Sequence, residues 1–189
     1  LSFPKSDFVE AMSQIFENWI EDYDIVSAFA KHYKTGEVFP EALFDSKLKA
    51  KNVSSGLNAQ GSLRYCIYDM SLYDKYNPKQ PLNTDALWQE IDTQMGVMDW
   101  HIKATHPQAS WIHINGAPVY TYGYLWSEVY AQDMFTVFEQ NGLRNPETGM
   151  KYRKLILANG GQRPIDEAVE EFLGRPTNNK AYIKSLGLD

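Results

Sequence analysis

The sequence predicts an all-α protein made of many helices. Apolar residues recur at the spacing of one helical face in segment after segment, and the breaks between these segments hold Gly, Pro or Asn. Of the 189 residues, 43% are hydrophobic and 22% are charged, which is an ordinary profile for a globular protein. A chain of this length is one domain by default, with two small domains as the alternative.

The first predicted helix starts after Asp7, which suits an N-cap. Its apolar residues follow a period of about 3.6, and they are Phe8, Ala11, Met12, Ile15, Phe16, Trp19 and Ile20. A second helix is predicted over residues 24–33, ending before Thr35-Gly36, where a glycine suits a helix C-terminus. Pro40 marks the start of a third helix, because proline is favoured in a first helical turn.

This third helix is predicted over residues 40–48. The later helices are predicted on the same grounds, over residues 57–73, 84–95, 118–141, 150–157, 164–173 and 178–186. Residues 77–81 are predicted to form a loop, because two prolines there remove amide donors and fix φ. Residues 101–117 are predicted to form an irregular connection, since they contain Pro107, Asn115 and Gly116.

A β-hairpin is the alternative for part of that connection. Residues 111–114 and 119–122 have strand propensity, and Asn115-Gly116 between them suits a tight hairpin turn. Pro118 argues against the hairpin, because it cannot donate to a strand ladder. Both interpretations stay open for this segment.

Charge and cysteine content exclude several classes of function. The net charge is −6, and no basic patch stands out, so a nucleic-acid partner is not expected. No apolar run approaches the roughly 18 residues that a membrane-spanning helix needs, so no membrane partner is expected. Cys66 is the only cysteine, which excludes an internal disulfide and fits a reducing compartment. We therefore expect a cytoplasmic rather than a periplasmic protein.

Glu10 lies in the first turn of the first predicted helix. The pattern alone favours a capping box, in which the Glu10 side chain reaches back to the amide of Asp7. A single carboxylate makes a poor metal site, because zinc takes three or four ligands. The four histidines are His32, His101, His106 and His113, and none forms the His-Glu-x-x-His motif of zinc peptidases.

Tyrosines crowd the sequence just after His113. They are Tyr120, Tyr122, Tyr124 and Tyr130. Neutral histidine and tyrosine side chains are good hydrogen-bond donors to an oxyanion that develops during a reaction. An aromatic helix face that packs on its neighbours is the other interpretation of the same residues.

Residues 7–10 read DFVE, and residues 122–129 read YGYLWSEV. These and several other short motifs resemble the thimet oligopeptidase, neurolysin and peptidyl-dipeptidase family of zinc metallopeptidases. The matching segments run in the same order over nearly all of the chain, and they are residues 7–19, 32–36, 122–129, 145–149, 160–161, 172–175 and 187–188. Within residues 7–19, the family motifs are DFVE at 7–10, SQ at 13–14 and ENW at 17–19. A chance match of this length and order is not expected.

The resemblance implies the C-terminal half of a neurolysin-like channel metallopeptidase fold, which hydrolyses short peptides between two helical halves. The family holds one zinc ion with two histidines of an upstream His-Glu-x-x-His helix and with the Glu of the DFVE word, which is Glu10 here. Zinc-activated water would attack the peptide bond. The two His ligands would lie outside this chain, so we expect the isolated chain to lack zinc.

The resemblance also assigns residues to the wall opposite the zinc. Tyr124 matches the tyrosine of the family's GYLW word, and His113 is assigned as the histidine of its Gly-rich loop. Tyr120 fills a second catalytic tyrosine position if the alignment slips by one residue. Tyr122 and Gly116 are expected to contact the substrate.

Two departures from the family pattern lie near these residues. The chain has Gly116-Ala117-Pro118 where the family usually has Gly-Gly-Tyr, and Thr121-Tyr122 where it usually has Tyr-Tyr. They favour a second hypothesis, in which the protein is a catalytically inactive helical binding or scaffold module derived from the same family. Zinc content and peptide hydrolysis would separate the two hypotheses.

The chain opens on Leu1 without a methionine and reaches a patterned helix within a few residues. We therefore expect residues 1–189 to be one helical fragment, the C-terminal part of a peptidase catalytic domain, that is inactive in isolation. Its partners would be short peptides and the missing N-terminal part of the same protein. The apolar face left exposed by that missing part would promote self-association.

Overall fold

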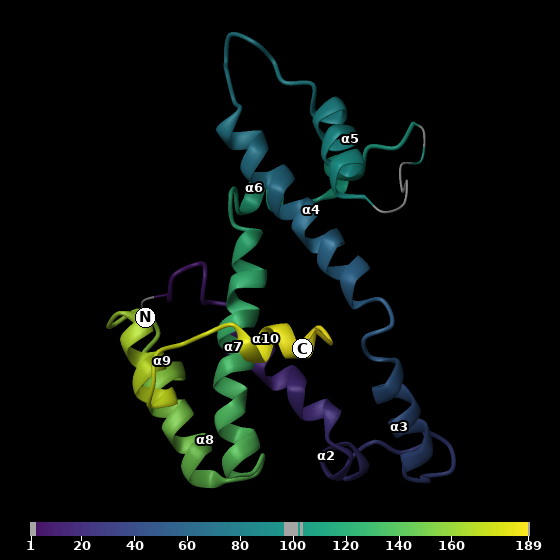
Figure 1. Cartoon of the computed structure of the whole chain (residues 1–189), viewed down its shortest axis with the longest axis vertical. Helices are drawn as coiled ribbons and strands as arrows, with labels where there is room; N and C mark the ends of the chain where they lie inside the picture. The colour runs from purple at the N-terminus through teal and green to yellow at the C-terminus, as the bar shows by residue number, and fades with distance from the viewer. Residues whose placement is uncertain (1–2, 97–101, 103, 189) are drawn as a thin grey trace. The chain divides into compact units, whose positions relative to one another are not determined.

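The computed structural model describes residues 3–96, 102 and 104–188, and helices dominate it (Figure 1). The helices in the N-terminal half of the chain are α1 Ala11–Gln14, η1 Ile15–Glu21, α2 Tyr23–Ser27, α3 Glu41–Ala50, α4 Ser55–Asp74 and α5 Thr84–Met95. The later ones are η2 Pro107–Ser110, α6 His113–Gly116, α7 Tyr122–Asn141, α8 Pro146–Tyr152, η3 Arg153–Leu157, α9 Ile165–Leu173 and α10 Lys180–Ser185. The all-α prediction is confirmed.

The chain divides into two compact units. The first unit comprises Leu1–Ser55 and Trp126–Asp189, and the second comprises Gly56–Leu125. Helix α7 contributes its first turn to the second unit and the rest of its length to the first. Each unit has an apolar core of its own.

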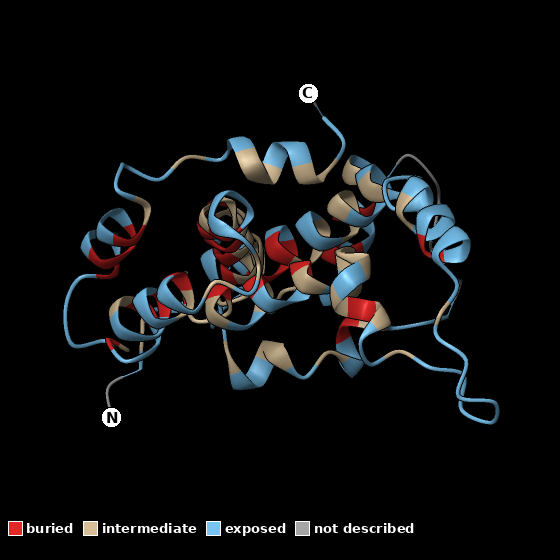
Figure 2. Ribbon diagram, turned by 90° about the horizontal axis from the view of Figure 1, so that it is seen from below, coloured by how far each residue is buried: buried red, intermediate tan, exposed pale blue. Residues whose placement is uncertain are grey.

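The first unit is built around α7, whose buried side chains meet α1, η1, η3 and α9. Its buried core residues are Phe8, Ala11, Ile15, Tyr130, Ala131, Met134, Phe138, Tyr152, Ile156, Ile165, Ala168, Val169 and Phe172. Figure 2 shows buried positions on one side of many helices and exposed positions opposite, the pattern that amphipathic helices produce. Aromatic rings interlock in this core, with Phe172 in contact with both Phe138 and Tyr152.

Three hydrogen bonds tie the N-terminal turn, α1 and η1 to the rest of the first unit. The Ser127 hydroxyl donates to the carbonyl of Asp7 at 3.1 Å, and the Trp19 indole donates to the carbonyl of Leu143 at 3.0 Å. The Tyr152 hydroxyl donates to the carbonyl of Met12 at 3.3 Å. Burial raises the pKa of the Tyr152 hydroxyl above its usual range, so it stays a proton donor at neutral pH.

The second unit consists of α4, α5, η2, α6 and the first turn of α7. Its core contains Tyr68, Leu87, Trp88 and Ile91, with Tyr65 and Trp111 packed against it. Asn83 caps α5 by accepting a hydrogen bond from the amide of Ala86 at 3.0 Å, as its position before the predicted helix suggests. Helix α5 has the bounds that its sequence pattern predicts.

The start of the first helix differs from the prediction. Glu10, rather than Asp7, is the N-cap of α1, and its side chain makes no capping hydrogen bond to that helix. The amides of Phe8 and Val9 both donate to the carbonyl of Lys5, so a separate turn precedes α1. The prediction of Asp7 as the N-cap is therefore wrong, because α1 begins after Glu10 and a turn closed by the Lys5 carbonyl comes before it.

Two other segments also differ from the sequence patterns. Helix α2 ends at Ser27 rather than near Tyr33, because the chain turns back at Gly36 and residues Lys31 and Val38 form an isolated antiparallel bridge. The alternative hairpin around Asn115-Gly116 is wrong, since α6 occupies residues His113–Gly116.

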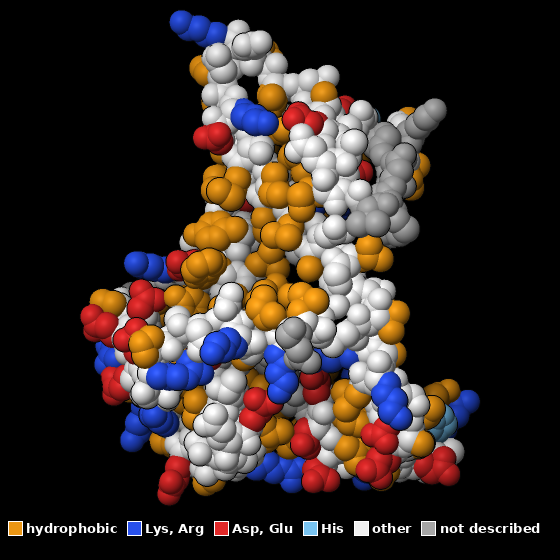
Figure 3. Space-filling model, in the orientation of Figure 1, with side chains coloured by type: hydrophobic (Ala, Val, Ile, Leu, Met, Phe, Trp, Pro, Cys, Tyr) orange, Lys and Arg blue, Asp and Glu red, His pale blue; other side chains and the backbone are white. Residues whose placement is uncertain are grey.

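The surface of α4 carries a row of exposed apolar side chains. They are Leu57, Leu63, Ile67, Met70 and Tyr73. On the face shown in Figure 3, hydrophobic side chains gather over the part of the molecule where α4 and α6 lie. Self-association through such a face stays a prediction. Within the described ranges, no helix is both long enough and apolar enough to cross a lipid bilayer.

Candidate active site

Glu10 is held in the first unit by the packing of the residues around it. Phe8, Ala11 and Ile15, on either side of it in sequence, are completely buried, while Glu10 itself is half-buried. The Glu10 carbonyl accepts hydrogen bonds from the amides of Ser13 and Gln14, at 3.1 and 2.9 Å. The turn that carries this carboxylate is therefore fixed by both its apolar neighbours and its backbone.

The residues around Glu10 fit one edge of a zinc site. A carboxylate is an ordinary zinc ligand, but one carboxylate is not a complete site. Among the residues that the structure describes, no group of three or more His, Cys, Asp and Glu side chains is placed to hold a metal ion. In the same turn, the Oδ1 atom of Asp7 is buried and has no hydrogen-bond partner among the described residues. Such a carboxylate oxygen suits the free ring N–H of a metal-bound histidine.

His113 and Tyr124 form a hydrogen-bonded pair in the second unit. The Nε2 atom of His113 lies 3.2 Å from the Tyr124 hydroxyl, and the two rings meet edge to face with centroids 5.9 Å apart. His113 begins the short helix α6, and Tyr124 lies in the first turn of α7. The fold therefore brings together two residues that are eleven positions apart in the sequence.

An aromatic row extends on both sides of this pair. The Tyr120 ring lies 5.7 Å from the Tyr124 ring, and the Trp111 ring lies 6.1 Å from the His113 ring. All four side chains are half-buried, so each keeps a solvent-accessible part. The three residues assigned to catalysis, Tyr120, Tyr124 and His113, thus form one cluster.

The second ring nitrogen of His113 is unusual. Its Nδ1 atom is buried and has no hydrogen-bond partner among the residues that the structure describes. Buried polar atoms without partners are rare in native proteins and call for an explanation, such as a ligand. The His113 ring can therefore bind Tyr124 through one nitrogen while the other remains available to a further group.

The two residues assigned to substrate contact lie at the ends of helices beside this cluster. Gly116 is the last residue of α6 and is exposed. Tyr122 is the first residue of α7 and is half-buried. Both belong to the second unit, as the cluster does, whereas Glu10 belongs to the first. His101 lies outside the described residues.

Sequence reasoning did not single out Asp69, which the structure places against the segment before α7. This carboxylate is 1% exposed and accepts hydrogen bonds from the amides of Val119 and Thr121. Its only sequence signal is a charged residue directly after the buried Tyr68, within a helix rich in apolar residues. The partners of Asp69 lie 50 and 52 residues further along the chain, so the local sequence does not reveal them.

Cys66 is a core residue. Its side chain is buried in α4, and burial, helped by the charge of Asp69, raises the pKa of the thiol to about 11. A thiol with such a pKa stays protonated at neutral pH and is a weak nucleophile. Thiol chemistry at this position is therefore not expected.

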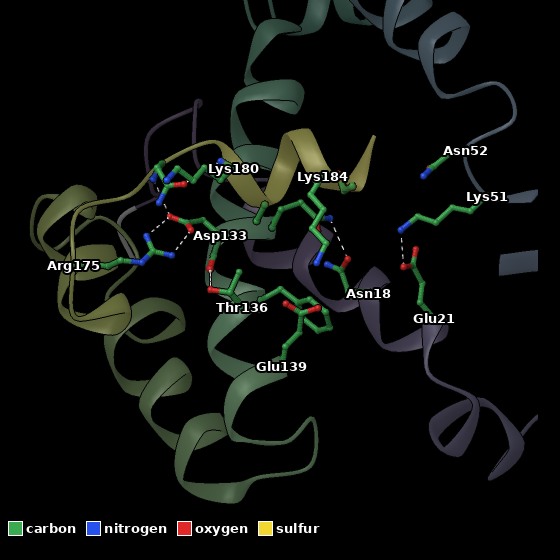
Figure 4. Close-up of a pocket in the computed structure, with 15 residues that line it drawn as sticks. Asn18, Glu21, Lys51, Asn52, Asp133, Thr136, Glu139, Arg175, Lys180 and Lys184 are labelled. Carbon is green, nitrogen blue, oxygen red and sulfur yellow. Dashed lines mark hydrogen bonds and ion pairs between the residues drawn. The ribbon is translucent and has the colours of Figure 1, made fainter. Parts of the chain in front are cut away.

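The first unit also contains a pocket of about 600 Å³ (Figure 4). It lies between η1, α7 and the C-terminal segment, and its lining includes none of the six residues predicted to form the site. One of its walls is the ion pair of Asp133 with Arg175, whose Nη2 and Oδ1 atoms are 2.5 Å apart. Charges of both signs line it, including Lys51, Lys180 and Glu139, so it does not select for one sign of ligand.

Comparisons with known proteins show the family of the chain. The model of a protein family described as "Peptidase family M3" matches residues 3–188 of this chain. Over 185 residues the chain is 35% identical to saccharolysin of Saccharomyces cerevisiae, covering 96% of this chain and 26% of that protein. It is 32% identical to the thimet-like oligopeptidase of Dictyostelium discoideum, covering 96% of this chain and 27% of that protein.

A bacterial relative shows the same relation. The chain is 33% identical to oligopeptidase A of Salmonella typhimurium over 183 residues, which cover 96% of this chain and 27% of that protein. The chain thus spans about a quarter of the length of these curated relatives. The resemblance drawn from the sequence words is confirmed, and with it the neurolysin-like fold. The family match extends from one end of the described chain to the other, so the chain belongs to peptidase family M3.

Proposed function

We propose that the full-length protein containing this chain is a zinc-dependent oligopeptidase that hydrolyses short peptides. The observation that carries the proposal is the hydrogen-bonded pair of His113 and Tyr124, found in a chain that belongs to a peptidase family. Glu10 is the third zinc ligand, and two histidines of the upstream part are the others. The isolated chain, which offers a single ligand, is inactive.

The residues of this chain perform three tasks in the proposed mechanism. Bound zinc supplies Lewis-acid activation of the substrate and of a water molecule. Glu10 holds the metal and sets its position relative to the fixed turn of the first unit. The Tyr124 hydroxyl donates a hydrogen bond to the oxyanion that develops on the scissile carbonyl, which lowers the barrier because the donor is preorganised.

His113 and Tyr120 support the Tyr124 hydroxyl. His113 holds it through the 3.2 Å contact between its Nε2 atom and the hydroxyl. Tyr120 packs edge to face on Tyr124 and offers a second phenol at the same wall. Tyr122 and Gly116 contact the backbone of the peptide beside this wall. The isolated chain self-associates through the apolar face of α4.

Metal removal tests the zinc part of the proposal. A strong chelator should lower peptide hydrolysis by the full-length protein by about 10³-fold or more, because the metal provides the main activation of water and carbonyl. Added zinc should restore the rate. A fluorogenic peptide of about ten residues serves as the substrate, and zinc content is measured in parallel. Hydrolysis that persists at zero zinc would contradict the zinc requirement. Zinc-loaded protein that binds the peptide without cleaving it would favour the inactive binding module instead.

The variant Tyr124→Phe tests the role of the hydroxyl. It keeps the ring contacts with His113 and Tyr120, and it should lower kcat by about 10²–10³-fold with little change in KM. Tyr130→Phe is the matched control on the same helix. There the lost hydrogen bond is made to Asp166 in the first turn of α9, at 2.9 Å, within the first unit, so kcat should not change. Equal effects of the two substitutions would contradict the assignment.

A further inference from the structure

Asp69 lies in the middle of α4, and its hydrogen-bond partners lie 50 and 52 residues further along the chain. Its Oδ1 atom accepts a hydrogen bond from the amide of Val119 at 2.9 Å. Its Oδ2 atom accepts one from the amide of Thr121 at 3.1 Å and another from the Thr121 hydroxyl at 2.9 Å. The carboxylate is 1% exposed, so these bonds replace the water that burial removes.

The segment that Asp69 binds has a strained backbone. Val119 has a φ of 57°, in the left-handed region that β-branched residues rarely adopt. Such a conformation persists only where the surrounding structure holds it, and it occurs often at functional sites. Hydrogen bonds to a carboxylate are among the stronger ones in proteins. Here the backbone amides of the residues just before and just after Tyr120 both donate to Asp69.

The held segment leads directly into the cluster of His113, Tyr120 and Tyr124. The Tyr120 carbonyl accepts a hydrogen bond from the Gly123 amide at 2.8 Å, and the Thr121 carbonyl accepts one from the Tyr124 amide at 3.3 Å. These bonds build the first turn of α7 upon the anchored residues. The positions of the Tyr120 ring and of the Tyr124 hydroxyl therefore follow from where Asp69 holds the backbone.

The same face of α4 also holds the other half of the cluster. Tyr73 lies four residues after Asp69, hence one helical turn along, and its hydroxyl donates to the carbonyl of Ile114 in α6. The residue before Ile114 is His113. One face of α4 is thus bonded to the segment before Tyr124 and to the short helix that begins at His113.

We propose that Asp69 is a positioning residue, which holds Val119 in its left-handed conformation and so aligns Tyr120 and Tyr124 with His113 for catalysis. Asp69 touches no substrate in this inference and acts only through the segment 119–121. The inference rests on the proposed peptidase function for its effect on rate. The anchoring itself is a property of the second unit and is measurable without activity.

The experiment uses the full-length protein with Asp69→Asn and two readouts. Asparagine keeps the size of the side chain but loses the charge and one acceptor, so it cannot satisfy both backbone amides. Hydrogen exchange of a peptide covering residues 117–124, followed by mass spectrometry, should become faster by about tenfold or more. The kcat for peptide hydrolysis should fall by about tenfold to a hundredfold with KM within about threefold, as expected for a misplaced catalytic group.

Two further variants separate positioning from general destabilisation. Val119→Gly in the Asp69→Asn background should recover part of the lost kcat, because glycine adopts a positive φ without strain. Asp92→Asn is the matched control, since Asp92 is a buried carboxylate of the same unit, 7% exposed, whose partner is Arg64 at 2.5 Å. The control should lower thermal stability while leaving kcat and the exchange of residues 117–124 unchanged.

If Asp69→Asn is poorly folded, Thr121→Val provides the same test with a smaller change. It removes one of the three donors to Asp69 and should lower kcat by about twofold to fivefold, with a matching increase in exchange.

Unchanged exchange at residues 117–124 in Asp69→Asn would overturn the inference, and so would faster exchange with an unchanged kcat. A zinc-loaded wild-type protein that cleaves no peptide would refute the proposed function and the effect on rate. In that case the exchange readout alone would still decide whether Asp69 anchors the segment.

Discussion

We expect Glu10→Ala to lower the zinc affinity of the full-length protein by roughly 10³-fold, because complete zinc sites reach about 10–16 kcal/mol and one of three ligands is lost. Hydrolysis at limiting zinc should fall by a similar factor. The Glu10 side chain makes no capping hydrogen bond to α1, so the substitution should not unfold that helix. Zinc affinity is measured by competition with a chelating dye, and helix content by circular dichroism.

The control for this prediction is Glu17→Ala. Glu17 follows Glu10 by seven residues and is exposed in the first turn of η1. It should leave zinc affinity unchanged, and Glu10→Gln should lie between the two, since an amide oxygen is a weaker ligand than a carboxylate. Full zinc content and activity in Glu10→Ala would remove Glu10 from the metal site.

We expect Asp133→Asn to lower the free energy of unfolding of the 189-residue chain by about 1–3 kcal/mol. The Asp133 carboxylate is buried and the change disturbs its hydrogen bonds, while the Arg175 side chain that pairs with it is 40% exposed and partly screened by solvent. Asp133 is 1% exposed on α7 and binds Arg175 of the C-terminal segment (Figure 4). It also accepts hydrogen bonds from the Thr177 hydroxyl and the Asn178 amide, both at 2.9 Å. Urea denaturation followed by tryptophan fluorescence measures the change. The substituted chain should also lose protection from proteolysis after residue 175.

The effect of Asp133→Asn should depend on pH in a defined direction. Burial alone would raise the pKa of the Asp133 carboxyl, but the hydrogen bonds from Arg175, the Asn178 amide and the Thr177 hydroxyl outweigh it and hold that pKa below its ordinary value. A carboxyl with a lowered folded-state pKa stabilises the fold fully above its unfolded pKa, about 4, and loses that contribution as pH falls through the folded value. The difference between wild type and variant should therefore be largest near pH 7 and shrink below about pH 4.

Glu171→Gln is the matched control for Asp133→Asn. It breaks the ion pair with Arg163, whose Nη2 lies 2.6 Å from a Glu171 oxygen, but the two side chains are 39% and 53% exposed. Solvent screens such a pair, so the free energy of unfolding should change by only about 0.2–1 kcal/mol. Similar losses in the two variants would show that burial does not set the strength of the Asp133 contact.

The fold class and the family follow from the amino-acid sequence alone. The apolar spacing in residues 84–95 predicts α5 with its observed bounds, because an amphipathic helix needs no distant partner to reveal its period. The motif YGYLWSEV identifies Tyr124, whereas the apolar pattern places the start of this helix at residue 118, four residues before α7 begins. Glu10 is assigned by the same kind of match, and its ligand role stays a prediction.

The local details came from the structure, because they depend on backbone bonds and packing contacts that the apolar pattern of the sequence does not reveal. The turn before α1 and the shortened α2 reflect backbone bonds to Lys5 and the bridge from Lys31 to Val38, which no periodicity encodes. The choice of α6 over a hairpin at Asn115-Gly116 likewise depends on packing, since local propensity is nearly balanced there. The same holds for Asp69. A buried carboxylate needs hydrogen-bond partners, and one partner of Asp69 lies 50 residues away in the sequence, so its role could not be predicted from the local pattern.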